Sequence, residues 1–143
     1  MGGGAVGTDK SLLTLISATT VRPKLYDVIV GCEATPADQA TEFLLARFTA
    51  VGTEGSGFTP IALDPGDPAS LCDCGQGVFG AEPTYTANAN LLRFSVNQRA
   101  TFRWVASPRG ELIAPASANN GIGCYSDSAT GSATHEACFH WEE

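Results

Sequence analysis

The segment "NLLRFSVNQRATFRWVA", from Asn90 to Ala106, decides the fold class. In its first half the apolar residues Leu92, Phe94 and Val96 alternate with polar ones. The same alternation returns at Phe102-Arg103-Trp104, after the central Asn97-Gln98-Arg99. A period of two places successive side chains on opposite faces of a strand. The segment therefore predicts two strands, each with one face on a core.

The rest of the chain extends the same pattern. Strand-like stretches cover 12–16 and "KLYDVIVG" at 24–31. The stretch "ATEFLLARFTA" (Ala40–Ala50) fits a helix or a strand, and the Gly-rich turn after it favours a strand. Turn signals separate roughly eight to ten such stretches at intervals of about 8–12 residues. We therefore predict an all-β fold, a jelly-roll-like antiparallel β-sandwich forming a single domain over 11–143, with a flexible N-terminal arm at 1–10.

Composition limits the classes of partner. The chain has 143 residues, of which only 16% are charged, and its net charge is −7. Such a balance argues against nucleic-acid binding, which needs clustered Lys and Arg to neutralise phosphates. There is no apolar run of the ~20 residues that a membrane helix requires. The first residues lack the basic and apolar regions of a signal peptide, so we expect synthesis in a host cytoplasm without a cleaved leader.

Five cysteines raise the question of crosslinks. If Thr130-Gly131-Ser132 forms a three-residue hairpin loop, Cys124 lies directly opposite Cys138, close enough for a disulfide. Closing that loop would contribute roughly 3 kcal/mol in the chain-entropy picture. Two reduced thiols remain the alternative, since disulfides are rare in the cytoplasm. Further crosslinks are possible at the remaining cysteines, Cys32, Cys72 and Cys74.

Metal sites have weaker support. Cys72-Asp73-Cys74 and the run His135, Cys138, His140 supply five potential ligands, but neither has the usual zinc spacing. In a strand, His135 and Cys138 point to opposite faces. The acidic residues Asp64, Asp67 and Asp73 suggest a site for an oxygen-ligated cation, but Asp-Pro turns explain the first two more simply. We expect no metal and no cofactor.

Signatures of catalysis are also missing from the sequence. It contains no nucleophile elbow, P-loop or dinucleotide-binding glycine pattern. The two histidines, His135 and His140, are five residues apart, so in one strand they face opposite sides and do not act as a pair. A nucleophilic pairing of Cys32 with a histidine has no support from spacing. We therefore expect a protein that is not an enzyme.

Several stretches together resemble a known family. They are "YDVIVG", "ATPADQATEFLLARFTAVGT", "TPIALDPGDPA", "EPTYTANANLL", "NQRATFRWVASPRGELIAPASANNGIG" and "CFHWEE". They are similar to small virion proteins of tailed bacteriophages that decorate or cement the head shell. The resemblance covers most of the chain from about Tyr26 onward, and its elements are scaffold strands and turns. The five cysteines depart from the family pattern and suggest crosslinks formed once a particle leaves the reducing host.

The resemblance implies a function. A cement protein of this kind is a structural virion protein on the head surface, a homotrimer or other small homo-oligomer that binds the major capsid protein and stiffens the lattice without catalysis. The alternative is a receptor- or glycan-binding module at a tail or fibre. For that module the aromatic residues available to stack on sugars are Tyr26, Tyr85, Trp104, Tyr125 and Trp141. They are spread over five segments, which indicates that most belong to the core.

Overall fold

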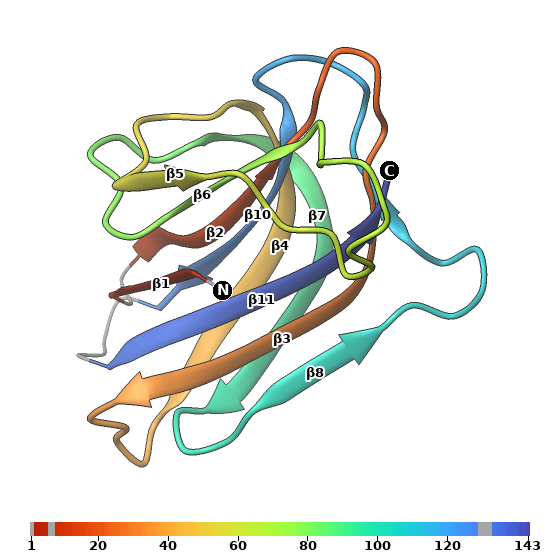
Figure 1. The fold of residues 1–143 in the computed structure, drawn as a ribbon. Helices are drawn as coiled ribbons and strands as arrows, with labels where there is room; N and C mark the ends of the chain where they lie inside the picture. Colours follow the sequence, from red (N-terminus) through yellow and green to blue (C-terminus); the bar gives the residue numbers. More distant parts are fainter. Residues whose placement is uncertain (1, 6–7, 129–132) are drawn as a thin grey trace.

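Two antiparallel sheets packed face to face make up the computed structural model, which describes residues 2–5, 8–128 and 133–143 (Figure 1). One sheet has the strand order β1-β11-β3-β8, with β9 added beside β3. The other has the order β5-β6-β2-β10-β4-β7. No helix occurs in the described residues, so the predicted all-β sandwich is confirmed. We call these sheets A and B.

The strands span most of the chain. Their bounds are β1 Gly2–Ala5, β2 Thr8–Ile16, β3 Lys24–Ala34, β4 Ala40–Ala50, β5 Ser56–Phe58, β6 Asp73–Gln76, β7 Thr84–Asn97, β8 Phe102–Val105, β9 Leu112–Ile113, β10 Gly121–Asp127 and β11 Thr134–Glu142. The ambiguous Ala40–Ala50 stretch is a strand over its whole length. The first strands lie inside the segment predicted as an arm: Gly2–Ala5 pairs with β11, and Thr8 begins β2.

Pairing between the strands is nested from the ends of the chain inward. β1 pairs with β11, β2 with β10, β3 with β8 and β4 with β7, and each of these pairs is antiparallel. Eight strands nested in two sheets in this way form a jelly roll. The short β5, β6 and β9 are additions to the two sheets. The predicted jelly-roll-like topology is therefore confirmed.

The deciding segment joins the two sheets. β7 lies in sheet B and β8 in sheet A, so residues 98–101 carry the chain from one sheet to the other. Gln98 is fully enclosed there: its backbone N–H donates to the Gln39 carbonyl at 2.9 Å, and its side chain donates to Thr41 Oγ1 at 3.2 Å. The polar centre of the segment is thus a buried, hydrogen-bonded corner.

The core lies between the sheets. It is formed by the inward residues of both sheets, among them Leu12, Leu15, Leu25, Val28, Val30, Phe43, Leu45, Ile122, Cys124 and Phe139. A second, smaller cluster of Leu44, Ala46 and Tyr125 is packed by Tyr85. The Tyr85 ring lies close to Gly123, where an added Cβ would come within 2.3 Å of its hydroxyl oxygen. That oxygen is 2.8 Å from Ser11 Oγ, which joins β7 to β2 across β10.

The terminal hairpin predicted from Cys124 to Trp141 is wrong. β10 lies in sheet B between β2 and β4, whereas β11 lies in sheet A between β1 and β3. The loop predicted at Thr130-Gly131-Ser132 lies outside the described residues. Nested pairing explains the difference, because each of the last strands pairs with partners from the first half of the chain. Local turn chemistry does not reveal such distant partners.

Candidate functional site

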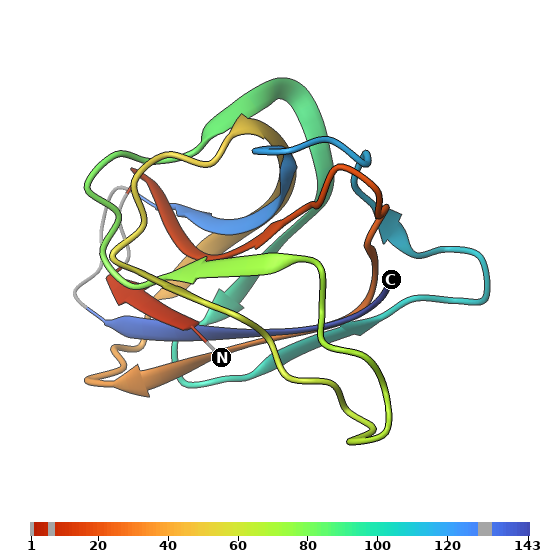
Figure 2. The ribbon, with the colours of Figure 1, turned by 45° about the horizontal axis from the view of Figure 1, so that its top comes forward.

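The connection between β5 and β6, residues 59–72, projects from the sandwich and reaches the C-terminal end of β11 (Figures 1 and 2). It exposes large apolar side chains: Ile61 is 92% exposed, Leu63 74% and Leu71 62%. Because monomeric proteins rarely gather such residues in one place, this arrangement is typical of an interaction surface. We call Ile61, Leu63 and Leu71 the apolar loop residues.

Glu143 fixes one end of this connection. Its carboxylate accepts hydrogen bonds from the backbone N–H of Leu71 at 2.8 Å and of Cys72 at 3.3 Å, and from the Ser70 hydroxyl. Trp141 Nε1 donates to it at 3.2 Å. Burial alone would raise the pKa of Glu143, but these hydrogen bonds outweigh it and lower the pKa. The connection is therefore attached to the end of β11 rather than free.

A groove of about 710 Å³ lies between this connection and β11. Its walls include Ile61, Leu63, Tyr26, Phe139 and Trp141. Most of the lining is apolar or aromatic, and His140, Glu142 and Glu143 add polar groups. Such a groove suits an apolar side chain or a short segment of a partner.

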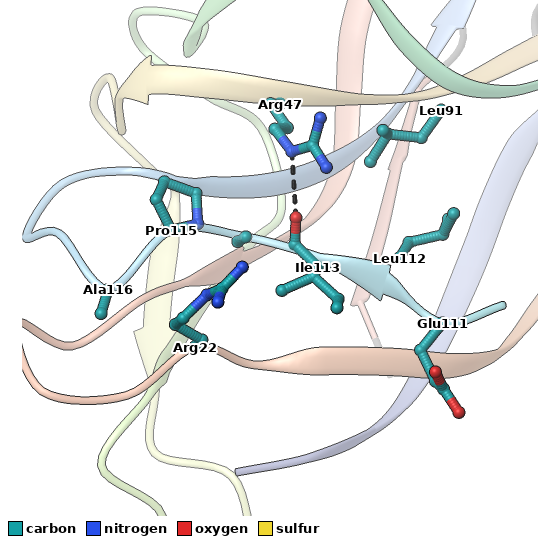
Figure 3. Close-up of a pocket in the computed structure, with 9 residues that line it drawn as sticks. Arg22, Arg47, Leu91, Glu111, Leu112, Ile113, Pro115 and Ala116 are labelled. Carbon is teal, nitrogen blue, oxygen red and sulfur yellow. Dashed lines mark hydrogen bonds between the residues drawn. The ribbon is translucent and has the colours of Figure 1, made fainter. Parts of the chain in front are cut away.

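A second pocket, of about 600 Å³, lies beside β9 (Figure 3). Arg22 and Arg47 approach the 111–116 segment from opposite sides, and Leu91 and Leu112 line one end. Arg47 Nε donates to the Ile113 carbonyl at 3.0 Å, which connects β4 of sheet B to β9 of sheet A. Glu111 also lines this pocket, and the two guanidinium groups beside apolar walls provide a place for a further carboxylate.

The outer face of sheet A carries a cluster of titratable groups. Arg103 on β8 donates to both oxygens of Asp27 on β3, Nε to Oδ1 at 3.0 Å and Nη2 to Oδ2 at 2.8 Å. His140 Nδ1 on β11 is 3.1 Å from Asp27 Oδ2, and its Nε2 is 3.8 Å from Cys138 Sγ. The hydrogen bond from Arg103 lowers the pKa of Asp27, burial opposes it, and His140 adds to the lowering.

The sequence analysis placed the two histidines on opposite faces of one strand, and the structure agrees. His135 is 1% exposed and packs edge-on against Phe43, with ring centroids 5.0 Å apart. His140 stacks on Tyr26 instead, on the outer face, with centroids 6.3 Å apart. The sequence analysis missed that Cys138 and His140, two residues apart, share that face. The spacing of two residues would have predicted this shared face.

The predicted Cys124–Cys138 opposition does not occur, because the two residues lie in different sheets. Cys124 is fully buried in the core between the sheets, while Cys138 is only partly buried and contacts His140 on the outer face of sheet A. Burial raises the pKa of Cys124 to about 12. All five cysteines are free thiols in the structure.

The other three cysteines differ in their surroundings. Cys72 and Cys74 are buried in the core, and burial raises their pKa values to about 11 and about 12. Cys32 on β3 is partly exposed, and its thiol donates to the Ala34 carbonyl at 3.3 Å. The proposed crosslinks at these positions stay predictions.

The aromatic residues that the sequence analysis named for sugar stacking do not form one surface. Tyr125 is buried, and Tyr85 packs on it with ring centroids 4.2 Å apart. Trp104 packs against the core. Tyr26 and Trp141 are the two that line one groove together.

The described residues contain neither a clustered set of metal ligands nor a membrane-spanning helix. Among them, no group of three or more His, Cys, Asp or Glu side chains is arranged to hold a metal ion. The same residues include no helix with the length and apolar character to cross a membrane. Comparison with protein-family models, with curated proteins and with solved structures found no match to this chain.

Proposed function

We propose that this chain is a structural virion protein that binds the major capsid protein lattice of a phage head and stabilises it as a small homo-oligomer. The observation that carries the proposal is the set of apolar loop residues beside the 710 Å³ groove. Leaving each of these side chains in water is less favourable than burying it by roughly 1.5–3 kcal/mol. Contact with another protein surface removes that cost.

The fold supports the same function. Eight-stranded jelly rolls occur in viral capsid domains, although a fold alone does not assign a function. The composition agrees, since only 16% of residues are charged, which suits lateral packing between copies. The Arg22–Arg47 pocket adds a place where an acidic side chain of a neighbour would dock.

Copy number tests this proposal. Phage particles that carry the gene are purified, and the chain is quantified by mass spectrometry against the major capsid protein. A ratio near one per capsomer position, or a simple fraction of it, is the expected result. A handful of copies per particle would place the protein at the portal or tail, and its complete absence would overturn a virion role.

The groove also gives the glycan-binding alternative one specific support. Tyr26 and Trp141 line it together with polar groups of His140 and Glu142, a combination that suits the face and hydroxyls of a sugar ring. A glycan array separates the two functions. Selective binding that a Trp141→Ala variant loses would favour the module, whereas a blank array together with lattice copy numbers favours the cement protein.

A further inference from the structure

We propose that Cys138 is an activated surface thiol that exchanges with disulfides, with His140 as its base and Asp27 as the residue that positions the imidazole. The inference is independent of the virion role. It rests on the alignment of the three side chains across β11 and β3: Cys138 Sγ lies 3.8 Å from His140 Nε2, and His140 Nδ1 lies 3.1 Å from Asp27 Oδ2.

Strand geometry brings these side chains together. Ala137 and Phe139 of β11 belong to the core, so the alternate residues Cys138 and His140 point to the outer face of sheet A. Asp27 is the register partner of His140 on β3. Directly opposed residues in an antiparallel pair are close enough for their side chains to interact. The triad is therefore built on rigid sheet positions.

Asp27 sets the orientation of the imidazole. Its side chain is only 5% exposed, and the double hydrogen bond from Arg103 holds it in place as a carboxylate. A carboxylate accepts the Nδ1–H hydrogen, which leaves the lone pair of Nε2 directed at the thiol. This is the order nucleophile, base and orienting group that activates cysteine in thiol chemistry.

The other cysteines lack this arrangement. Cys72, Cys74 and Cys124 are buried thiols with raised pKa values, which keeps them protonated. Cys32 is the matched comparison, because it is also partly exposed on sheet A but donates to a backbone carbonyl instead of an imidazole. Cys138 is thus the thiol expected to react first.

The exchange balances with a disulfide as the co-reactant. His140 Nε2 takes the Cys138 proton, and the thiolate attacks one sulfur of a low-molecular-weight disulfide R–S–S–R. The Cys138–S–S–R bond forms as the original S–S bond breaks, and the leaving thiolate RS⁻ receives the proton from the imidazolium. Cys138 is oxidised to the mixed disulfide while one RS group is reduced to the thiol.

Acyl transfer fits this site poorly. An acyl-transfer enzyme needs free backbone N–H groups or other donors aimed at a developing oxyanion. Cys138 lies inside the β-ladder, opposite Ile29 of β3, and its neighbour Ala137 is the last residue of β11 that pairs with the described part of β1, at Gly2. Disulfide exchange requires no such donors, because the charge stays on sulfur.

The test is the rate of reaction with 5,5′-dithiobis(2-nitrobenzoate) at pH 7 under native conditions. We expect a fast phase of one thiol per chain in the wild type. The fast phase persists in Cys32→Ser and is lost in Cys138→Ser. Because an ordinary thiol is only about 3% thiolate at pH 7, loss of the base in His140→Gln slows this phase roughly tenfold.

Two controls keep the result decisive. In denaturant all five cysteines react, and the reaction rate of His140→Gln equals that of the wild type. A thermal melt checks that His140→Gln is folded, and His140→Phe is used in its place if His140→Gln is not folded. With oxidised glutathione, peptide mapping places the adduct on Cys138. A fast phase that survives Cys138→Ser, or a rate that His140→Gln and His140→Phe leave unchanged, would overturn the proposal.

Discussion

At the scale of single residues, His135 is the side chain most sensitive to conditions. It is 1% exposed, and within the described part of the chain neither ring nitrogen makes a hydrogen bond of ordinary geometry. Burial lowers the pKa of His135, and the nearby Ala133 backbone only partly offsets that effect. The neutral ring is therefore tolerated as an apolar group against Phe43, and a charged ring is not.

The first prediction is a loss of stability in mild acid. Well above pH 6.5 the imidazole is neutral in both folded and unfolded states. Below 6.5 the unfolded chain binds a proton that the folded chain resists, because its pKa is lowered. The free energy of unfolding then falls by up to about 1.4 kcal/mol per pH unit, until the pH reaches the folded-state pKa. Urea denaturation at pH 7.5 and 5.5 measures the difference.

The matched variant is His135→Leu, which keeps a similar volume and removes the titrating group. It is expected to lose much of the decrease between pH 7.5 and 5.5. Asp27 does not imitate this effect, because its pKa is lowered and the stability it contributes is lost only at more acidic pH. A His135→Leu profile as steep as that of the wild type would assign the acid sensitivity to another group.

Only part of the candidate thiol site can be predicted from the sequence. Cys138 and His140 are two positions apart, so their shared face is readable from the sequence once β11 is recognised as a strand. Asp27 is not readable, because it reaches His140 through the pairing of β3 with β11, across 113 residues of chain. The position of Asp27 beside His140 is therefore set by the strand topology and not by a local sequence pattern.

At the scale of elements, the alternation of apolar and polar residues predicts where strands lie better than it predicts which strands pair. Asn90–Ala106 covers the second half of β7 and the whole of β8, two strands as expected, and Ala40–Ala50 is one continuous strand. The failure lies in the terminal hairpin, where the turn signals between β10 and β11 suggested a local pairing. Each strand instead pairs with strands from the first half of the chain: β10 with β2 and β4, and β11 with β1 and β3. Burial outweighs local turn preference.

The second prediction concerns the attachment of residues 59–72. Glu143→Ala removes the acceptor for Leu71, Cys72 and Ser70. Hydrogen bonds to a charged group contribute modestly at an exposed site, so we expect roughly threefold to tenfold faster proteolysis of this connection. The global free energy of unfolding should change by only about 0.5 kcal/mol. Limited proteolysis with peptide mapping checks the first effect, and urea denaturation the second.

Glu142→Ala is the control for that experiment. Glu142 is the adjacent residue, and its carboxylate pairs with Lys24 at 3.4 Å. Its replacement is expected to leave the proteolysis rate at wild-type level. Equal cleavage in Glu143→Ala and the wild type would mean that the connection is held by its other contacts.

At the scale of the whole molecule, the chain is a two-sheet jelly roll with an apolar projection at residues 59–72. Of the five large apolar residues that are exposed in the described ranges, four lie between β5 and β7: Ile61, Leu63, Leu71 and Val78. The remaining one, Val105, lies on β8. Association through the projection would bury the surface that folding leaves in water, which makes residues 59–72 the first place to test for self-association.

The third prediction follows from that asymmetry. Replacing both Ile61 and Leu63 by Ser should weaken self-association at least tenfold, because two apolar side chains would lose a contact worth roughly 1.5 kcal/mol or more in total. The free energy of unfolding should stay within about 0.5 kcal/mol, since both residues are already exposed in the monomer. Sedimentation equilibrium over a concentration series gives the dissociation constant.

Val105→Ser, which removes an exposed apolar residue from β8, is the control and should associate like the wild type. If the double variant also associates normally, the interface lies elsewhere on the sandwich, and the apolar loop residues are not part of it.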